Sequence, residues 1–434
     1  MKKINLLFLV LTLALFCSSL SYSQPNVSTS IPSGQARFEA LGYNPFLIDA
    51  ATDLNRNPAW GGVYKNYAFG EIGAYSTFND NKDSTYVLRD QYAGVNFRLG
   101  SQWAAGLIVN KNEGEIFSGD IRTTYRGLGI SDPIVPIKLL AAYTSKNMSF
   151  GLAPYFARWS GVFLDSGDGG LGVSLDNSSS VFGATLGLVA TQSGNSWTEG
   201  AITIRKNSYE SVRKDTSAPT VTFDNDGGLE FNVFGRGYYK MGGGSVKLVP
   251  YVSFASFNWD PVRSPVLIGA STNEYSKWSI LAGIGINMPV AGDGLIVGGI
   301  SGGYLSDKLT TTAGSSGSTT ESKVNSLILP QFNVGLEWNL TSWLMGRVGF
   351  ARAIIDRKFE ATTTGTSSGT FEFSELVASN PDQTITLGVG WQVDRFSLDG
   401  LMGERFFQTG PNILSGKEND LFGRLSMSYN FRTK

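Results

Sequence analysis

The residues QFNVGLEWNL (331–340) alternate between apolar and polar side chains. Apolar residues stand at every even position from Phe332 to Leu340, while Asn333, Glu337 and Asn339 stand between them. A two-residue period places all the apolar side chains on one face of a β-strand and the others on the opposite face. The stretch therefore predicts a strand that separates an apolar from a polar environment.

The same alternation recurs along the chain from residue 67 to residue 432. The lengths of these segments bracket the roughly ten residues that a tilted strand needs to cross a bilayer's hydrocarbon. The sixteen segments are 67–78, 91–99, 102–112, 135–145, 148–158, 179–192, 196–207, 227–241, 244–258, 274–289, 293–308, 323–340, 343–360, 380–393, 395–408 and 419–432.

The connections between these segments alternate between short and long. Short ones include 100–101, 146–147 and 341–342, whereas long ones rich in Ser, Thr, Gly and Asp include 208–226 and 361–379. Brief periplasmic turns and longer outside loops are typical of outer-membrane barrels, in which closure pairs every strand edge. We therefore predict an all-β fold, a transmembrane antiparallel β-barrel of sixteen strands over residues 67–434.

Five of the nine tryptophans lie close to a predicted short turn. Indole prefers the boundary between hydrocarbon and water, so such residues are expected to form an aromatic girdle at the periplasmic rim. The alternative is that they are ordinary core or edge aromatics of a soluble β protein. The predicted girdle residues are Trp103, Trp197, Trp338, Trp343 and Trp391.

The polar residues of each alternating segment are expected to face the barrel lumen. They include both acidic and basic side chains. The candidate lumen residues are Arg98, Glu199, Glu230, Arg236, Glu337 and Arg424. No ring of one sign is present that would select ions. We expect these charges to pair across the lumen and hold the plug; the alternative is that they bind a substrate. Several apolar residues are also expected to face the lumen, and such a mixed lining suits an amphipathic ligand. These are Leu186, Leu188, Phe234, Tyr238, Leu281 and Tyr304.

The first 23 residues have the pattern of a secretory signal peptide. Lys2 and Lys3 precede an apolar run over 4–16, and small residues stand before residue 24. Cys17, the only cysteine, lies inside this segment, and bulky Phe16 before it disfavours a lipid anchor there. The mature chain is therefore expected to contain neither a disulfide nor a thiol.

Histidine is absent from the whole chain. This excludes Ser-His-Asp and Cys-His catalysis and every metal site that needs an imidazole. No basic block is present, so a nucleic-acid partner is not expected. We predict that the protein is not an enzyme and carries no cofactor.

Residues 24–66 differ from the rest, because short helical patterns replace the alternation. The second helical pattern is interrupted just before the first strand by Asn57, Pro58, Ala59 and Trp60. Pro58 fixes its own φ and keeps the backbone of Asn57 out of the helical region. The Asn57 side chain can form a hydrogen bond with the backbone nearby, which ends a helix or a turn. We expect this segment to fill the lumen as a plug; the alternative is a soluble N-terminal extension.

The stretches GQARFEALG (34–42) and IDAATDLNRNPAW (48–60) resemble the opening of the FadL-like family of outer-membrane transporters, which includes PorV-type barrels. The resemblance implies an N-terminal plug, Asn57, Pro58 and Ala59 at its junction with the barrel, and passive uptake of hydrophobic molecules. It also implies fourteen strands, an alternative to the sixteen counted here. PorV-type relatives instead imply a partner of a secretion machine that binds protein cargo at the cell surface.

The sequence therefore predicts an exported outer-membrane barrel that transports hydrophobic or amphipathic small molecules passively. The expected partners are the lipid bilayer and the barrel-assembly machinery, the latter through the C-terminal strand (419–432). Secretion components are the expected partners under the alternative, non-transporting function.

Overall fold

The protein is described by a computed structural model in which β-strands form a single closed barrel. The described residues are 34–73, 91–113, 134–165, 173–192, 196–215, 221–225, 227–242, 245–263, 272–290, 294–313, 317–365, 368–378, 385–403 and 424–431. The predicted signal peptide and residues 24–33 lie outside them.

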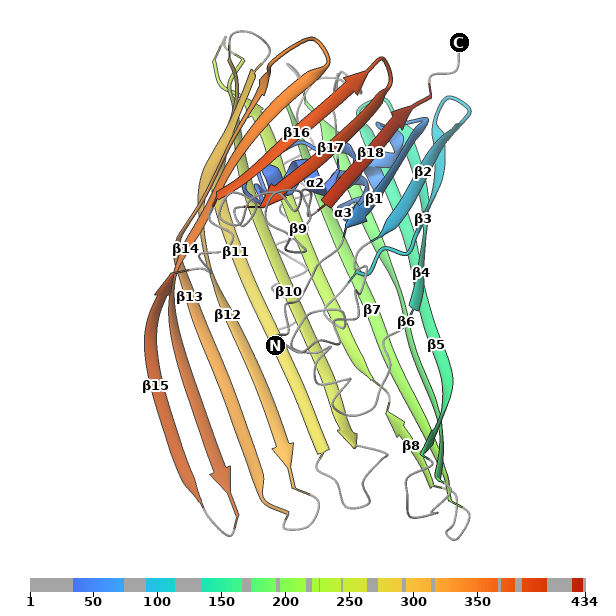
Figure 1. Cartoon of the computed structure of the whole chain (residues 1–434), viewed down its shortest axis with the longest axis vertical. Helices are drawn as coiled ribbons and strands as arrows, with labels where there is room; N and C mark the ends of the chain where they lie inside the picture. The colour runs from blue at the N-terminus through green and yellow to red at the C-terminus, as the bar shows by residue number, and fades with distance from the viewer. Residues whose placement is uncertain are drawn as a thin grey trace, which may run out of the picture.

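The barrel wall consists of eighteen strand segments with antiparallel neighbours (Figure 1). They are β1 (Tyr67–Gly73), β2 (Tyr92–Leu99), β3 (Trp103–Val109), β4 (Ile134–Ser145), β5 (Met148–Asp165), β6 (Val173–Thr191), β7 (Trp197–Asp215), β8 (Val221–Asn225), β9 (Gly228–Lys240), β10 (Lys247–Arg263), β11 (Thr272–Val290), β12 (Gly294–Thr312), β13 (Thr319–Asn339), β14 (Leu344–Thr364), β15 (Gly369–Ala378), β16 (Ile385–Val393), β17 (Phe396–Gly403) and β18 (Arg424–Asn430).

Two pairs of segments are single strands with an interruption. β8 and β9 both pair with β7, and β15 and β16 both pair with β14. β1 pairs with both β2 and β18, which closes the ring. Eighteen segments less two interruptions give sixteen strands, so the predicted count is confirmed and the count of fourteen is wrong.

The strands differ in length around the barrel. β1, β2 and β3 have 7–8 residues, whereas β13 and β14 have 21 each. At about 3.3 Å per residue a 21-residue strand spans roughly 70 Å, more than a tilted strand needs for a bilayer. We call the end with the short connections the turn end and the opposite end the loop end; β8 and β15 lie at the loop end (Figure 1).

β8 and β15 fall in segments that were predicted to be loops, 208–226 and 361–379. Ser, Thr and Gly around them are typical of loops, and the polar loop-end parts of the neighbouring strands lack a clear apolar face. A strand that extends beyond the hydrocarbon needs no apolar face, so periodicity alone does not reveal it.

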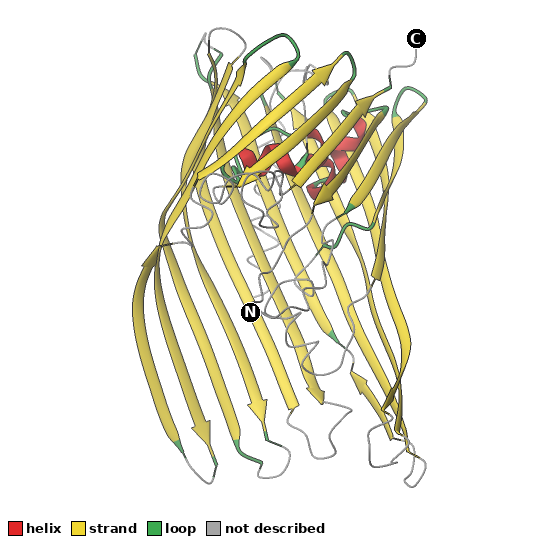
Figure 2. Cartoon of the chain, in the orientation of Figure 1, coloured by secondary structure: helices red, strands yellow, loops and turns green. Residues whose placement is uncertain are grey.

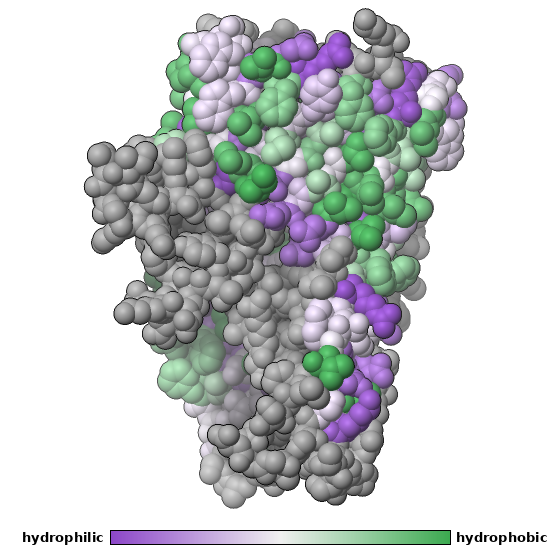
Figure 3. Space-filling model, turned by 45° about the vertical axis from the view of Figure 1, so that its right-hand side comes forward, coloured by the Kyte–Doolittle hydropathy of each residue, from purple (hydrophilic) through white to green (hydrophobic). Residues whose placement is uncertain are grey.

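Apolar side chains on the outward face are exposed, while their polar neighbours are buried in the lumen. On β13, Phe332 is 42% and Val334 46% exposed, whereas Asn333 is 0% and Glu337 7% exposed. On the face shown in Figure 3, apolar residues gather over the upper, turn-end part of the barrel. The alternation therefore predicted the two faces of this strand correctly.

Four of the five predicted girdle tryptophans lie on the outward face near the turn end. Trp103, Trp338 and Trp343 are 40–53% exposed, and Trp391 lies in the outward phase of β16. Trp197 is only 1% exposed and lies inside the barrel, so its assignment to the girdle is wrong. The reason is the strand period itself, because Trp197 stands two residues from the inward Glu199 and shares its face.

Three of the apolar residues predicted in the lumen face outward instead: Leu186, Leu188 and Tyr304. Leu188 lies opposite Phe150, which is 48% exposed. Leu186 is 60% exposed, and the Tyr304 ring lies 5.1 Å from the outward Trp278 ring. Leu186 and Leu188 share a face with Phe182, so the alternation itself favours an outward position for both. Around Tyr304 the two faces have similar apolar content, so the period does not establish which face is inward. Phe234 and Tyr238 share the inward face of β9 with the buried Arg236.

Short helices lie inside the ring of strands near the turn end (Figure 2). They are α2 (Gln35–Ala40), α3 (Ala50–Arg56) and the 3₁₀ helix η1 (Pro58–Gly62). α2 packs against β14, β16, β17 and β18, while η1 packs against β3, β4, β5 and β6. We call residues 34–62 the plug segment. No helix among the described residues is long and apolar enough to cross a membrane.

Candidate functional site: the plug segment and two cavities beside it

The junction between α3 and η1 is set by Asn57 and Pro58. Asn57 has extended dihedrals (φ −139°, ψ 105°), which end α3 at Arg56. Its side-chain oxygen accepts a hydrogen bond from the Ala59 amide at 3.0 Å, and Pro58 occupies the first position of η1, where no amide donor is needed. The predicted turn chemistry of this junction is therefore present in the structure.

Arg236 on β9 holds the centre of the plug segment. Its guanidinium donates to the Leu47 carbonyl at 2.6 Å, to the Glu199 carboxylate at 2.6 Å and to the Asp53 carboxylate. All three charged side chains are no more than 1% exposed. Burial raises the pKa of Asp53 to about 6, although Arg236 acts in the opposite direction.

Glu199 on β7 connects this ion pair to the plug junction. Its Oε2 accepts hydrogen bonds from Trp60 Nε1 at 2.6 Å and from Asn57 Nδ2 at 3.0 Å. The Trp60 ring packs edge-on against Trp197, with centroids 4.7 Å apart. The junction is thus fixed by hydrogen bonds to a buried charge as well as by aromatic packing.

A second set of buried charges ties α2 to the opposite part of the wall. Arg37 donates to both Glu337 oxygens, at 2.8 and 3.0 Å, in a bidentate arrangement. Arg347 donates to Glu337 at 2.6 Å and forms an ion pair of 2.6 Å with Asp399. The start of the plug segment is therefore attached to β13, β14 and β17 through one chain of charges.

A third set attaches both ends of α2 to the strands that close the barrel. Arg424 on β18 pairs with Glu71 on β1 at 3.0 Å and with Glu39 on α2 at 3.3 Å. Glu71 also accepts from the Gln35 amide. This cluster joins the two strands at the closure of the ring to the plug segment.

Five of the six predicted lumen residues are buried inside the barrel. The structure brings Glu199 and Arg236 together, while Glu337 and Arg424 bind other parts of the plug segment and Glu230 pairs with Arg205 at 2.8 Å. Arg98 instead lies exposed at the turn end, where its Nε donates to the Gly100 carbonyl. It lies at the rim of the barrel and not deep in the lumen, because β2 ends at Leu99 next to the turn.

Several residues of these clusters were not among the predicted site residues. Arg347 and Asp399 are charged residues within apolar strand patterns, which is a usable signal for a lumen position. Arg37, Asp49 and Asp53 lie in the plug segment, where no strand period exists, so their partners could not be inferred.

Glycines on the inner wall allow the plug segment to approach the strands closely. A Cβ on Gly151 would overlap the backbone of Pro58 and Ala59, with the Ala59 Cα at 2.7 Å, and one on Gly187 would overlap the Asn57 side chain. Elsewhere, Cβ atoms on wall glycines would overlap Phe46, Gly42 or Ala40 of the plug segment. We call these the seat glycines; they are Gly151, Gly187, Gly285, Gly349 and Gly388.

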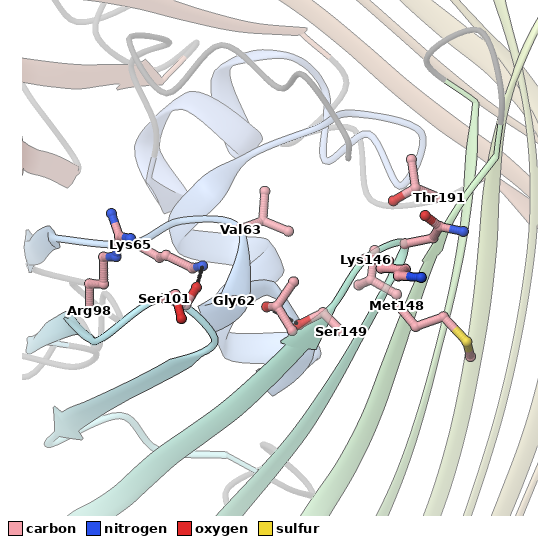
Figure 4. Close-up of a pocket in the computed structure, with 12 residues that line it drawn as sticks. Gly62, Val63, Lys65, Arg98, Ser101, Lys146, Met148, Ser149 and Thr191 are labelled. Atoms are coloured by element: carbon pink, nitrogen blue, oxygen red, sulfur yellow. Dashed lines mark hydrogen bonds between the residues drawn. The ribbon is translucent and has the colours of Figure 1, made fainter. Parts of the chain in front are cut away.

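A cavity of about 320 Å³ lies on the turn-end side of η1. Lys65 and Arg98 lie on one side of it, and Lys146 and Met148 lie on the other (Figure 4). Ser149, also in its lining, donates to the Ala59 carbonyl at 2.6 Å. We call this the turn-end cavity.

A second cavity of about 320 Å³ lies on the loop-end side of the plug segment. We call it the loop-side cavity; α3 contributes Asn55 and Arg56 to it, and β7 contributes Thr203 and Arg205. Along the inward face of β6, Thr185 lines this cavity and Val189 lines the turn-end cavity. Gly187 lies between Thr185 and Val189 and is covered by Asn57. The junction of the plug segment therefore separates the two cavities.

The described residues bring together no group of three or more His, Cys, Asp or Glu side chains that could hold a metal ion. The charges that face the plug segment are engaged in pairs that hold it.

Neither a protein-family profile nor a curated protein matches this chain. Several solved structures share a low level of similarity with it. The ferric-catecholate import receptor Fiu of E. coli K12 in its open form has 10% identity and a TM-score of 0.34, over 84% of this chain and 81% of that one. The siderophore receptor PiuA of Acinetobacter baumannii has 10% identity and a TM-score of 0.35, over 78% and 71% of the two chains. Similarity at this level indicates neither a common barrel architecture nor a common substrate.

Proposed function

We propose that this protein is an outer-membrane β-barrel that passes hydrophobic or amphipathic small molecules passively across the membrane. The observation that carries the proposal is the pair of cavities on opposite sides of the plug segment, separated by the Asn57–Pro58–Ala59 junction. In this proposal a molecule enters from the loop end and reaches the loop-side cavity. It leaves at the turn end when the junction moves away from its seat glycines.

The proposed membrane location rests on the outward apolar surface. Exposed Phe, Leu, Ile and Val side chains cover strands all round the turn-end part, far more than a soluble monomer shows. Toward the loop end β13 reads TTESKVNS (319–326), which is mostly polar and suits water or headgroups. This arrangement supports a hydrocarbon belt around the turn-end part.

Removal of detergent is expected to precipitate the purified protein within hours, because the apolar belt would then face water. Light scattering and size-exclusion chromatography measure the loss of the monodisperse species, and return of the protein to lipid vesicles is the control. A chain that stays monodisperse in plain buffer would contradict the membrane location.

The proposed substrate class rests on the aromatic lining of the loop-end half. Tyr155, Phe257 and Trp259 are buried together there, and partly buried Tyr275 packs against them. Such a lining with polar groups beside it suits a molecule that has an apolar body and a polar head. The resemblance of residues 34–62 to FadL-like barrels is consistent with this class.

A disulfide between the plug segment and the wall is expected to block transport. A Cβ on Gly62 would lie 3.3 Å from the Ser149 Cβ, close to the roughly 3.5 Å lower limit for disulfides, and the predicted mature chain has no other cysteine. In intact cells that produce Gly62→Cys/Ser149→Cys, uptake of a fluorescently labelled lipid should fall to the level of cells without the chain. A reductant should restore it.

The two single-cysteine variants are the matched controls, and a reductant should leave the uptake of each of them unchanged. Equal uptake by cells with and without the chain would remove the transport proposal. Full uptake by the oxidised double variant would instead show that passage does not require the junction to move.

A secretion partner that binds protein cargo is the second candidate function. The observation that favours it is β15, which extends the loop end and exposes Phe371 at 60%, Phe373 at 47% and Leu376 at 74%. A cargo polypeptide could pack on such a surface outside the membrane. Crosslinking of residue 371 to one defined cargo protein, with no lipid uptake by the same cells, would favour this function over transport.

A further inference from the structure

The loop-side cavity has a wall built from cross-strand pairs of side chains. In the register of β7 and β9, Ala201 lies opposite Phe234, Thr203 opposite Asn232 and Arg205 opposite Glu230. Thr203 shares a hydrogen bond of 2.8 Å with Thr185 on β6. The cavity wall thus contains an apolar pair, a neutral polar pair and a charged pair of side chains.

The charges that line this cavity are unbalanced. Arg56, Lys111 and Arg205 are cations, and Glu113 is the one carboxylate among the described lining residues. Glu113 is already paired with Arg205 at 2.7 Å and with Lys138 at 3.0 Å behind it. A positive surplus therefore remains at the cavity surface, which favours an anion.

Aromatic rings position the two cations that have no carboxylate partner among the described residues. The Arg56 guanidinium lies over the Phe234 ring at 4.7 Å, and the Lys111 ammonium lies over the Tyr92 ring at 4.3 Å. Neither contact cancels the charge, because a ring face supplies only a weak, partial negative potential. Both cations thus remain able to bind an anion.

Five of the residues that line the cavity each have a buried polar atom with no hydrogen-bond partner among the described residues. Two of these atoms are donors, Arg56 Nη1 and Arg205 Nε, and the Arg205 side chain is only 7% exposed. Two are amide acceptors, Asn55 Oδ1 and Asn232 Oδ1, and the fifth is the Thr52 hydroxyl. Buried polar atoms are nearly always satisfied, so five on residues around one cavity indicate a ligand or water site.

We propose that the loop-side cavity binds an oxyanion that carries hydroxyl groups next to it. A carboxylate or phosphate satisfies the guanidinium donors and the surplus charge, while its neighbouring hydroxyls donate to the two amide oxygens. The volume of about 320 Å³ is enough for a small molecule or a lipid head group. This inference concerns equilibrium binding and does not depend on transport.

The test is calorimetric titration of the full protein in an uncharged detergent. Glycerol 3-phosphate is the free ligand, lysophosphatidylglycerol carries the same chemistry on an acyl chain, and hexanoate is an anion without hydroxyls. We expect Arg56→Gln and Asn232→Leu each to weaken binding about tenfold or more. Arg357→Gln is the matched control, because Arg357 pairs with Glu375 at the exposed loop end.

Each outcome has a defined meaning. Binding of glycerol 3-phosphate that both cavity variants weaken supports a free ligand, and binding of the lysolipid alone with the same sensitivity supports a head group. Hexanoate binding as tight as that of glycerol 3-phosphate would overturn the role of the hydroxyls. Absence of binding by both phosphates, or binding that neither cavity variant changes, would overturn the site.

Discussion

Replacement of Arg236 by methionine should release the plug segment while the barrel stays closed. The substitution keeps the aliphatic volume but leaves the buried Asp53 and Glu199 carboxylates without their shared cation and frees the Leu47 carbonyl. Breaking a buried ion pair from one side typically costs about 3–5 kcal/mol. Since each 1.4 kcal/mol is about tenfold, the opening equilibrium of the plug segment should shift by roughly a hundredfold or more.

Hydrogen exchange of the plug segment amides, measured by mass spectrometry in detergent, checks this prediction. Exchange over residues 34–62 should accelerate, while exchange in β9 to β14 should not. Arg357→Met is the control, because this arginine forms an exposed pair with Glu375 and should change nothing in the plug segment. Unchanged protection in Arg236→Met would show that packing alone holds the plug segment.

The effect of Arg236→Met should also depend on pH. The pKa of Asp53 is raised to about 6 from 3.8, so its contribution to stability is fully present below 3.8 and is lost as the pH rises through 6. Without Arg236 the charged carboxylate is more costly still. The variant should therefore exchange faster relative to the unsubstituted chain at pH 7.5 than at pH 5.

Replacement of Gly151 by valine should displace the junction between the two cavities. A Cβ at this position would overlap the backbone of Pro58 and Ala59, which cannot rotate away as a side chain would. The valine methyl groups enlarge the overlap, so η1 must leave its seat. In planar bilayers the variant should open channels with several times the current of the unsubstituted chain.

Gly369→Val is the matched control, since a Cβ on Gly369 of β15 would meet no atom within 4 Å. It adds the same side chain to the same kind of strand without touching the plug segment. Equal current in the two variants, with both barrels folded by circular dichroism, would show that the junction is not the barrier. Gly187→Val should act as Gly151→Val does, because it overlaps Asn57 of the same junction.

The barrel could be predicted from the sequence because each strand carries its own evidence. A period of two over QFNVGLEWNL is a local property, and the short connections fix the neighbours of each strand. The strand prediction was wrong where a segment lacks this local pattern. β8 and β15 lie in stretches rich in Ser, Thr and Gly that resemble loops, and the run FEF (371–373) in β15 is too short to predict a strand by itself.

Fewer contacts of the candidate site could be predicted from the sequence, because these contacts join distant parts of the chain. Arg37 and Glu337 are 300 residues apart, and no local pattern links them. The strand period did identify Glu337, Glu199 and Arg236 as polar inward positions. It could not say that Asp53 would meet Arg236, since the plug segment has no register with the wall.

The seat glycines also bear on how such proteins can change over evolutionary time and in the laboratory. A plug with larger residues at Ala40 or Phe46 would need a different wall, and a wall with larger residues at Gly388 or Gly285 would need a different plug. The two parts must therefore be inherited together. A chimera that grafts the N-terminal sixty residues of another barrel onto these strands should assemble only if the matching small residues are transferred with them.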